Sequence, residues 1–147
     1  MFGVIVGGPL AADANAASGS GVQQQPAFDV SGDTHTLQGN KAHDNFGDGF
    51  HIIGNTHTLT GNVAKFNGED GIDIDGGASG VILDGNVAKG NGGVGIEVSP
   101  NVTIQSLTNN IAKTNNLDFC NDGMVTMSAG NHFGTTGTPG SCSIIGD

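Results

Sequence analysis

The sequence contains no arginine, tryptophan or tyrosine, and its four lysines are its only side chains with a permanent positive charge. The formal net charge is −10. Surfaces that bind nucleic acid neutralise phosphates with clusters of lysine and arginine, so this composition argues against a nucleic-acid partner. It is compatible with cation binding and with the charged surface of a secreted or cell-surface protein.

Long apolar runs and helical patterns are also missing. No apolar stretch approaches the length of a membrane span. The opening stretch, MFGVIVGGPL, has no basic region, and Gly7–Pro9 interrupts its apolar residues, so we do not interpret it as a signal peptide. No segment has the 3.6-residue period of an amphipathic helix, and 27 glycines are too many for long helices to form. The 147 residues are therefore predicted to form one domain without helices.

What the sequence has in abundance is an internal repeat. The pattern Asn-x-Ala-x-x-Asn occurs four times, with steps of 22, 24 and 24 residues between equivalent asparagines. A period in the twenties is typical of a solenoid, in which each coil stacks on the one before. We interpret the asparagines as tight corners whose amides hydrogen-bond from coil to coil, and we expect the alanines to face inward. The four copies are Asn40, Ala42 and Asn45; Asn62, Ala64 and Asn67; Asn86, Ala88 and Asn91; and Asn110, Ala112 and Asn115.

Short runs in which apolar and polar residues alternate indicate that the solenoid is built from strands. Each run has two apolar positions, which are Phe28 and Val30, Phe50 and Ile52, Ile72 and Ile74, Ile96 and Val98, and Leu117 and Phe119. A third apolar position recurs as Leu37, Leu59, Leu83 and Leu107. The sequence thus predicts an all-β, parallel β-helix of about four to five coils with a period of 22–24 residues. Equivalent residues of successive coils should stack about 4.8 Å apart.

Two of these patterns also carry a family resemblance. The Asn-x-Ala-x-x-Asn repeat and the Asp-Gly-Ile-x-Ile pattern at Asp70–Ile74 resemble the right-handed parallel β-helix repeat family, which has the pectate-lyase-like fold. The resemblance covers about residues 28–119. It implies a right-handed coil, and it implies that an active site would lie on the outward face of the strands.

The first part of the chain, residues 1–27, is expected to depart from the repeat. Val4–Val6 is predicted to form a degenerate first strand that aligns with Phe28–Val30, 24 residues further on. Ala11–Gly21 consists mostly of small residues and is predicted to be a linker. A chain that starts in mid-coil in this way would be a fragment of a longer β-helix.

The last part, residues 120–147, is predicted to be a capping loop that covers the open end of the repeats at 28–119. Cys120 and Cys142 are the only two cysteines of the chain. An even number of cysteines in an apparently secreted chain favours a disulfide, so we expect a bridge to close this cap. Many members of the family that the chain resembles have a closing loop tied by a cysteine pair.

The outward positions of the strands carry the candidate functional residues. If the first apolar residue of each strand faces inward, the next residues face outward, and these are Asp29, His51, Asp73, Glu97 and Asp118. Asp75 lies on the same face as Asp73. Neighbouring rungs would place Asp73 and Glu97 about 5 Å apart, close enough to bind Ca²⁺ together or to take part in acid–base glycoside chemistry. We therefore take His51, Asp73, Asp75 and Glu97 as the candidate site, to which Asp48, Glu69 and Asp70 at the preceding corner could add ligands.

Three absences argue against catalysis at this face. No arginine or suitably placed lysine could act as a lyase base or neutralise a uronate, and no tryptophan or tyrosine could stack on a sugar. No long loop between Asp33 and Leu117 could wall a substrate cleft. The motifs of polygalacturonases, paired Asp with His-Gly and Arg-x-Lys, do not occur either. Acidic residues are also the ordinary decoration of solvent-facing strand positions.

The expected function is therefore that of a secreted or cell-surface β-helix module, without catalysis, that binds a polysaccharide or is displayed on a cell-surface glycan. It needs no cofactor, and Ca²⁺ is its candidate ligand at Asp73 and Glu97. One alternative is a small polysaccharide lyase or glycoside hydrolase, or a fragment of one, that uses His51, Asp73, Asp75 and Glu97. Another is a structural stalk or filament subunit that associates end to end.

Three of the four lysines share one position of the repeat. Lys65, Lys89 and Lys113 are each 24 residues apart, so they should form a column along the solenoid. Like charges at this spacing repel one another and must be solvated or matched by carboxylates. We interpret the column as a solvated face, with binding of an acidic glycan as the alternative.

Overall fold

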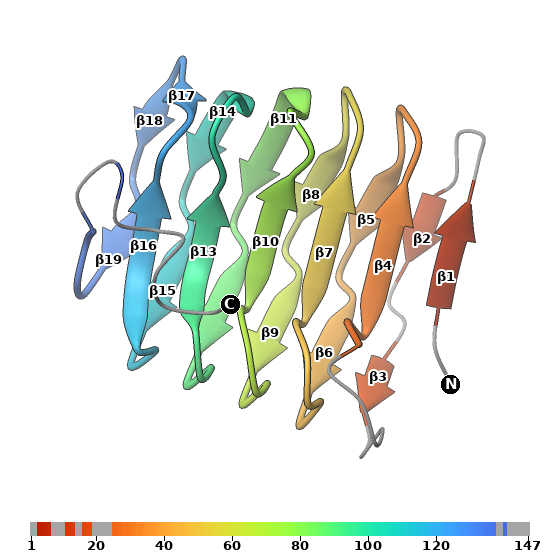
Figure 1. Ribbon diagram of the computed structural model, residues 1–147, viewed down its shortest axis with the longest axis vertical. Helices are drawn as coiled ribbons and strands as arrows, with labels where there is room; N and C mark the ends of the chain where they lie inside the picture. The colour runs from red at the N-terminus through yellow and green to blue at the C-terminus, as the bar shows by residue number, and fades with distance from the viewer. Residues whose placement is uncertain (1–2, 7–10, 14–15, 19–24, 138–139, 141–147) are drawn as a thin grey trace.

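Nineteen short strands and no helix make up the part of the chain that the computed structural model describes, which comprises residues 3–6, 11–13, 16–18, 25–137 and 140. The strands form three parallel sheets that wind around a common axis for about five turns (Figure 1). No described residue belongs to a helix long and apolar enough to cross a membrane. The predicted all-β solenoid is confirmed.

Each coil contributes one strand to each sheet, except that the last coil contributes two short strands to sheet 2. Sheet 1 contains β1 (Gly3–Val6), β4 (Phe28–Ser31), β7 (Phe50–Ile53), β10 (Ile72–Asp75), β13 (Val94–Val98) and β16 (Leu117–Asn121). Sheet 2 contains β2 (Ala11–Asp13), β5 (Thr36–Gln38), β8 (Thr58–Thr60), β11 (Ser79–Asp84), β14 (Thr103–Thr108), β17 (Met124–Val125) and β18 (Ser128–Ala129). Sheet 3 contains β3 (Ala16–Ser18), β6 (Lys41–His43), β9 (Val63–Lys65), β12 (Val87–Lys89), β15 (Ile111–Lys113) and β19 (His132–Phe133).

The core is a set of apolar columns that run along the axis. Phe50, Ile72 and Ile96 pair in successive strands of sheet 1, and all three are fully buried. The rings of Phe28 and Phe50 stack with centroids 4.7 Å apart, and the rings of Phe119 and Phe133 do the same at 4.4 Å. The predicted leucine column in sheet 2 and alanine column in sheet 3 are buried as well, and the alanines are Ala42, Ala64, Ala88 and Ala112. The alternation in the sequence therefore predicted the inward face correctly.

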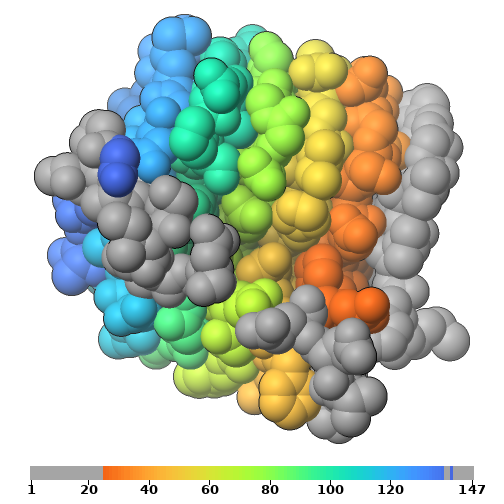
Figure 2. Space-filling view, viewed as in Figure 1, coloured from red at the N-terminus to blue at the C-terminus, as the bar shows by residue number. Residues whose placement is uncertain are grey.

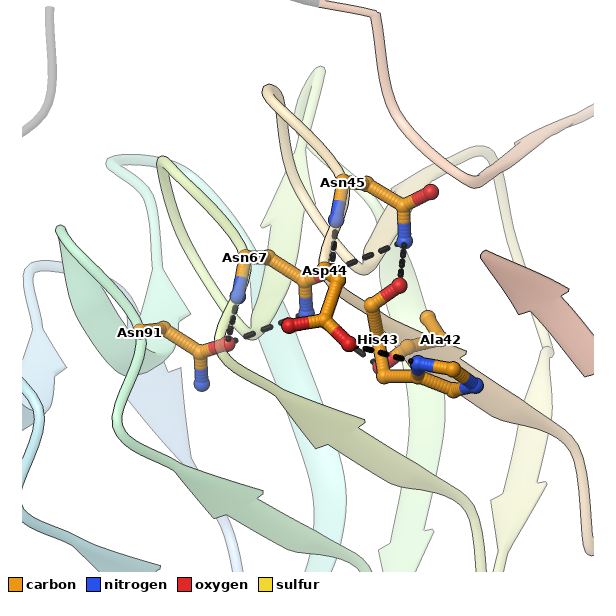
Figure 3. A network of polar contacts seen from close by, with 6 residues as sticks. All are labelled: Ala42, His43, Asp44, Asn45, Asn67 and Asn91. Atoms are coloured by element: carbon orange, nitrogen blue, oxygen red, sulfur yellow. Dashed lines mark hydrogen bonds and ion pairs between the residues drawn. The ribbon is translucent and has the colours of Figure 1, made fainter. Parts of the chain in front are cut away.

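Two ladders of asparagine amides connect the coils. In the first, Oδ1 of Asn86 accepts both the backbone N–H of Asn62, at 2.9 Å, and its side-chain amide, at 3.0 Å. Nδ2 of Asn86 donates to the carbonyl oxygen of Leu59 at 2.9 Å, so every polar atom of this buried side chain is used. The same arrangement runs through Asn40, Asn62, Asn86, Asn110 and Asn131. A second ladder runs through Asn45, Asn67, Asn91 and Asn115, and Figure 3 shows its first three members.

The residue before each amide of the first ladder has a left-handed backbone. Gly61 and Gly85 adopt φ values of 62° and 65°, and Asn109 adopts 55° at the equivalent position of a later coil. Glycine adopts this conformation without steric cost, and asparagine tolerates it better than most residues. The recurrence of Gly-Asn and then Asn-Asn in the sequence follows from this corner.

The beginning of the chain differs from the prediction in two ways. A first strand is present, but Gly3 pairs with Phe28 and Val4 with Asp29, one residue away from the predicted alignment. The predicted linker at Ala11–Gly21 contains β2 and β3, which pair with β5 and β6. Parallel pairing uses backbone groups, so small residues can form these strands without an apolar pattern.

The end of the chain also differs. In β16, Phe119 and not Leu117 pairs with Ile96, so the strand is displaced by two residues from the predicted alignment. Residues 120–137 are not only a capping loop, because β17, β18 and β19 pair in parallel with β14 and β15 and continue the solenoid. Cys120 is fully buried in β16, whereas Cys142 lies outside the described residues, so their bridge stays a prediction.

Two buried histidines stack in the corner between sheets 1 and 2. The rings of His35 and His57 are parallel, with centroids 5.2 Å apart, and both side chains are almost inaccessible to solvent. Nδ1 of His57 accepts the backbone N–H of His35 at 3.2 Å, while its Nε2 lies 3.2 Å from the carbonyl oxygen of Ile53. Since Nδ1 accepts a hydrogen bond, the buried ring of His57 must be neutral. Burial lowers the pKa of His57 below 6.5, and the neighbouring His35 lowers it further.

We expect Ala88→Leu to destabilise the protein by about 1–3 kcal/mol, because overpacking strains a close-packed interior. Ala88 is fully buried, and a Cβ built on Gly71 would lie only 2.9 Å from its Cβ, so little space remains there. Val87→Leu enlarges the half-buried neighbour that faces outward and is the matched control. Urea unfolding of both variants measures the difference. Equal stability of Ala88→Leu and wild type would contradict the packing described here.

The free energy of unfolding should fall as the pH drops below about 6.5, because the unfolded chain then binds a proton that the folded His57 resists. The raised pKa of Asp48, about 6, acts in the opposite direction, since a raised carboxyl pKa lowers stability as the pH rises through that range. His57→Val, which introduces the residue found at the equivalent Val81, should reduce the loss between pH 6.5 and 5. Urea unfolding at each pH measures both slopes, and identical slopes would contradict the assignment to His57.

Candidate functional site

The outward face of sheet 1 brings a histidine between two carboxylates. Asp29, His51 and Asp73 occupy paired positions of β4, β7 and β10. Nδ1 of His51 lies 3.2 Å from Oδ1 of Asp29, and Nε2 lies 3.8 Å from Oδ2 of Asp73. Figure 2 shows this side of the molecule, on which the coils run as adjacent bands of side chains. The imidazole on β7 therefore lies between the carboxylates of the two neighbouring rungs.

Asp75 completes a group of three potential metal ligands. One ring nitrogen of His51 and one carboxylate oxygen each from Asp73 and Asp75 all lie within 4.8 Å of one another. His51 and Asp73 are half-buried, whereas Asp75 at the end of β10 is exposed. Imidazole nitrogens and carboxylate oxygens are common ligands of divalent cations. The strand period of two residues, combined with the pairing of adjacent coils, produces this proximity.

Glu97 has a different environment from the other three predicted residues. It pairs with Asp73 along sheet 1, as expected, but it is 8% exposed and is not part of the close group. On its other side it pairs with Cys120 of β16. The close group of three potential ligands is therefore His51, Asp73 and Asp75, and the Ca²⁺ site expected at Asp73 and Glu97 stays a prediction.

Asp48 and Asp70, expected as further ligands, cap the backbone of the following coil. Oδ1 of Asp48 accepts the backbone N–H of Asp70 at 2.9 Å, and Oδ1 of Asp70 accepts that of Val94. Burial raises the pKa of Asp48 to about 6. The hydrogen bond from Asp70 and the charge of His51 lower this pKa, while the charges of Asp70 and Asp29 raise it. The ionisation of Asp48 is thus coupled to the charges of Asp29 and His51.

Asp118 does not lie in the outward row, contrary to expectation. Its Oδ1 accepts both the backbone N–H and the side-chain amide of Asn115 at 2.9 Å, so it ends the second asparagine ladder. Its Oδ2 accepts the backbone N–H of Thr135 at 2.8 Å. Burial opposes ionisation, but these hydrogen bonds hold the pKa of Asp118 below its ordinary value. The shifted register of β16 explains why sequence reasoning misplaced this residue.

The electrostatic character of sheet 1 limits the chemistry at this site. All four lysines of the chain lie in sheet 3, and the chain has no arginine. No strand of sheet 1 therefore offers a permanent cation that could neutralise a uronate or stabilise a developing carbanion. The geometry is suited to holding a cation between His51, Asp73 and Asp75. Sequence reasoning identified these three residues but not the contact between His51 and Asp29, although Asp29 was placed in the same row.

The comparisons with known proteins agree with this architecture. A family model described as a right-handed β-helix region matches residues 14–143, which is most of the chain. No curated protein and no solved structure matches the chain significantly. Parallel coils of three strands, buried amide ladders and the family match lead to the same conclusion. The chain belongs to the right-handed β-helix family.

Proposed function

We propose that this β-helix is a non-catalytic module that binds a polysaccharide or cell-surface glycan through a divalent cation held by His51, Asp73 and Asp75. The observation that carries the proposal is the convergence of three ligand atoms within 4.8 Å on an outward sheet face. Three protein ligands leave coordination positions open on Ca²⁺, which takes six to eight oxygen ligands. Hydroxyl or carboxylate groups of a glycan could occupy those positions.

The charge distribution supports a role for a cation. His51 already lies between Asp29 and Asp73, and Asp48 adds a further nearby carboxylate. Carboxylates this close repel one another, and a bound cation would relieve the repulsion. Two carboxylates suit Ca²⁺, while the imidazole suits transition metals such as Mn²⁺ or Zn²⁺ better. The identity of the cation is therefore part of the test.

The residues around His51, Asp73 and Asp75 are the reason for proposing a site without catalysis. Lyases and hydrolases of acidic polysaccharides need a base or a cation at the reacting sugar, and no lysine or arginine occurs in sheet 1. The alternative is an enzyme in which His51 and Asp73 perform acid–base chemistry. It predicts turnover, whereas the binding proposal predicts retention of an intact glycan.

A secreted or cell-surface location is part of the same proposal. A bridge between Cys120 and Cys142 would be consistent with it, because disulfides persist in oxidising compartments. Such a bridge would fasten the end of the chain to β16, where Cys120 is buried. By the loop-entropy model it would contribute about 3 kcal/mol to stability.

Titration of Ca²⁺, Mn²⁺ and Zn²⁺ into the protein by calorimetry should reveal one cation site per chain. Asp73→Asn/Asp75→Asn removes two ligands and should weaken binding by at least about tenfold. Asp33→Asn/Asp84→Asn removes the same charge at positions outside the group, and it is the matched control. Equal cation affinity in wild type and in Asp73→Asn/Asp75→Asn would contradict the proposed site.

The same proteins should then be tested on acidic and neutral polysaccharides, with cation and with EDTA. We expect a component of binding that requires the cation, that both EDTA and Asp73→Asn/Asp75→Asn remove, and that releases no reducing sugar or unsaturated product. Turnover that is lost in the variant would establish the enzyme alternative. Cation binding without any effect on polysaccharide binding would contradict the glycan part of the proposal.

A further inference from the structure

All permanent positive charges on side chains lie on one sheet. Lys41, Lys65, Lys89 and Lys113 belong to β6, β9, β12 and β15 of sheet 3, and the chain contains no arginine. Lys65, Lys89 and Lys113 pair with one another in register, and His43 pairs with Lys65 one coil earlier. Lys65, Lys89 and Lys113 are called here the cationic column, and its members are about 4.8 Å apart along the axis.

Within the described ranges, no carboxylate lies close enough to pair with the lysines of this column. Among the residues that the structure describes, no lysine forms an ion pair, and the one ion pair at the column joins Nδ1 of His43 to Oδ2 of Asp44 at 2.9 Å. Like charges one rung apart repel each other, and the repulsion is not offset within sheet 3. The net charge of the chain is −10, so a column of positive charges differs from the rest of the surface. An anionic ligand would offset the repulsion between its lysines.

An apolar column runs beside the cationic column. Val63, Val87 and Ile111 pair in register two residues before the lysines, and they therefore lie on the same outward face. Val63 and Val87 are half-buried, and Ile111 is 37% exposed. The face thus combines aliphatic surface with a line of positive charges. Sugar rings can pack on the aliphatic surface, and their acidic groups can pair with the charges.

A groove of about 330 Å³ lies at one end of this face, lined by Lys41, Ala42, His43, Asp44, Val63, Lys65 and Phe66. Figure 3 shows the part of its wall where His43 contacts Asp44 next to the second asparagine ladder. Phe66 is 59% exposed, although its ring packs on Gly90, where a Cβ would lie 2.8 Å from the ring carbons. An aromatic ring held in place but open to solvent offers a surface on which a sugar ring can pack.

We propose that the outward face of sheet 3 binds a linear acidic polysaccharide. Its carboxylate or sulfate groups lie along Lys65, Lys89 and Lys113, and one sugar ring packs against Phe66 in the groove. A row of equally spaced charges suits a chain with repeated negative groups better than a single small anion, because each contact raises the effective concentration of the next. The aliphatic column and Phe66 favour a polymer of sugar rings over a polyphosphate, which has no rings to pack on this surface.

This binding face is independent of the cation group on sheet 1. It uses direct contacts with lysine, so EDTA should leave it intact and salt should weaken it. Asp73→Asn/Asp75→Asn should likewise leave it intact. Failure of one proposal is therefore distinguishable from failure of the other.

The test is calorimetric and chromatographic binding of heparin, polygalacturonate and neutral dextran in EDTA at low salt. Lys65→Gln/Lys89→Gln/Lys113→Gln should weaken binding of the two acidic polymers by at least tenfold. Neither wild type nor any variant should bind dextran. The matched control is Gln25→Glu/Gln38→Glu/Gln105→Glu, which changes the net charge by the same amount at exposed positions outside sheet 3. Thermal unfolding verifies that both triple variants fold.

The role of the groove is tested separately. Phe66→Ser should weaken binding of the acidic polymers severalfold, and Phe66→Tyr should restore it. Equal binding by wild type and the lysine variant, or an equal loss in the glutamine-to-glutamate control, would overturn the proposal. Binding of anionic phospholipid vesicles with the same lysine dependence, without binding of either polysaccharide, would overturn it in favour of a membrane surface.

Discussion

Stacked asparagine amides are the interaction on which the geometry of this solenoid depends. After the first member of each ladder, every asparagine side-chain oxygen accepts two hydrogen bonds from the preceding coil, as Oδ1 of Asn86 does from Asn62. An amide buried without these partners would cost about 1–3 kcal/mol, so a slip of one coil against the next is strongly disfavoured. The ladders therefore lock the register in which all other residues stack. Asp118 and Asn131 end the two ladders by supplying the last acceptor oxygen.

A locked register turns a repeat in sequence into columns on the surface. On sheet 1 it places His51 between Asp29 and Asp73, and it brings Asp75 into the same group. On sheet 3 it aligns Lys65, Lys89 and Lys113. The two faces carry opposite charge although they belong to the same coils, because each strand contributes its outward residues to only one sheet. This separation is the physical basis for proposing a cation-dependent site on one face and a direct anion-binding site on another.

The features that recur in every repeat, which are the corners and the inward face of the strands, were predicted correctly from the sequence. Asn-x-Ala-x-x-Asn marked the corners, and the alternation around Ile72 and Ile74 marked the inward face. The sequence could not place the ends, because the strands at Ala11–Asp13 and Ala16–Ser18 form through backbone pairing without an apolar signal. In β16, the run Leu117–Asn121 alternates equally well in two registers, and only tertiary packing places Phe119 beside Ile96. The row of His51 and Asp73 followed from strand periodicity, whereas the burial of Glu97 depends on the assembled fold.

The central claim is that buried amide ladders hold the coils in register. Hydrogen exchange of the asparagine side-chain amides, followed by NMR in the native protein, tests it most directly. The account predicts that the Nδ2 protons of Asn62, Asn67, Asn86 and Asn91 exchange only on global unfolding, as slowly as the backbone amides of the central strands. The side chain of Asn101, which is exposed, is the internal reference for fast exchange. Exchange of the ladder amides at the rate of Asn101 would contradict the account.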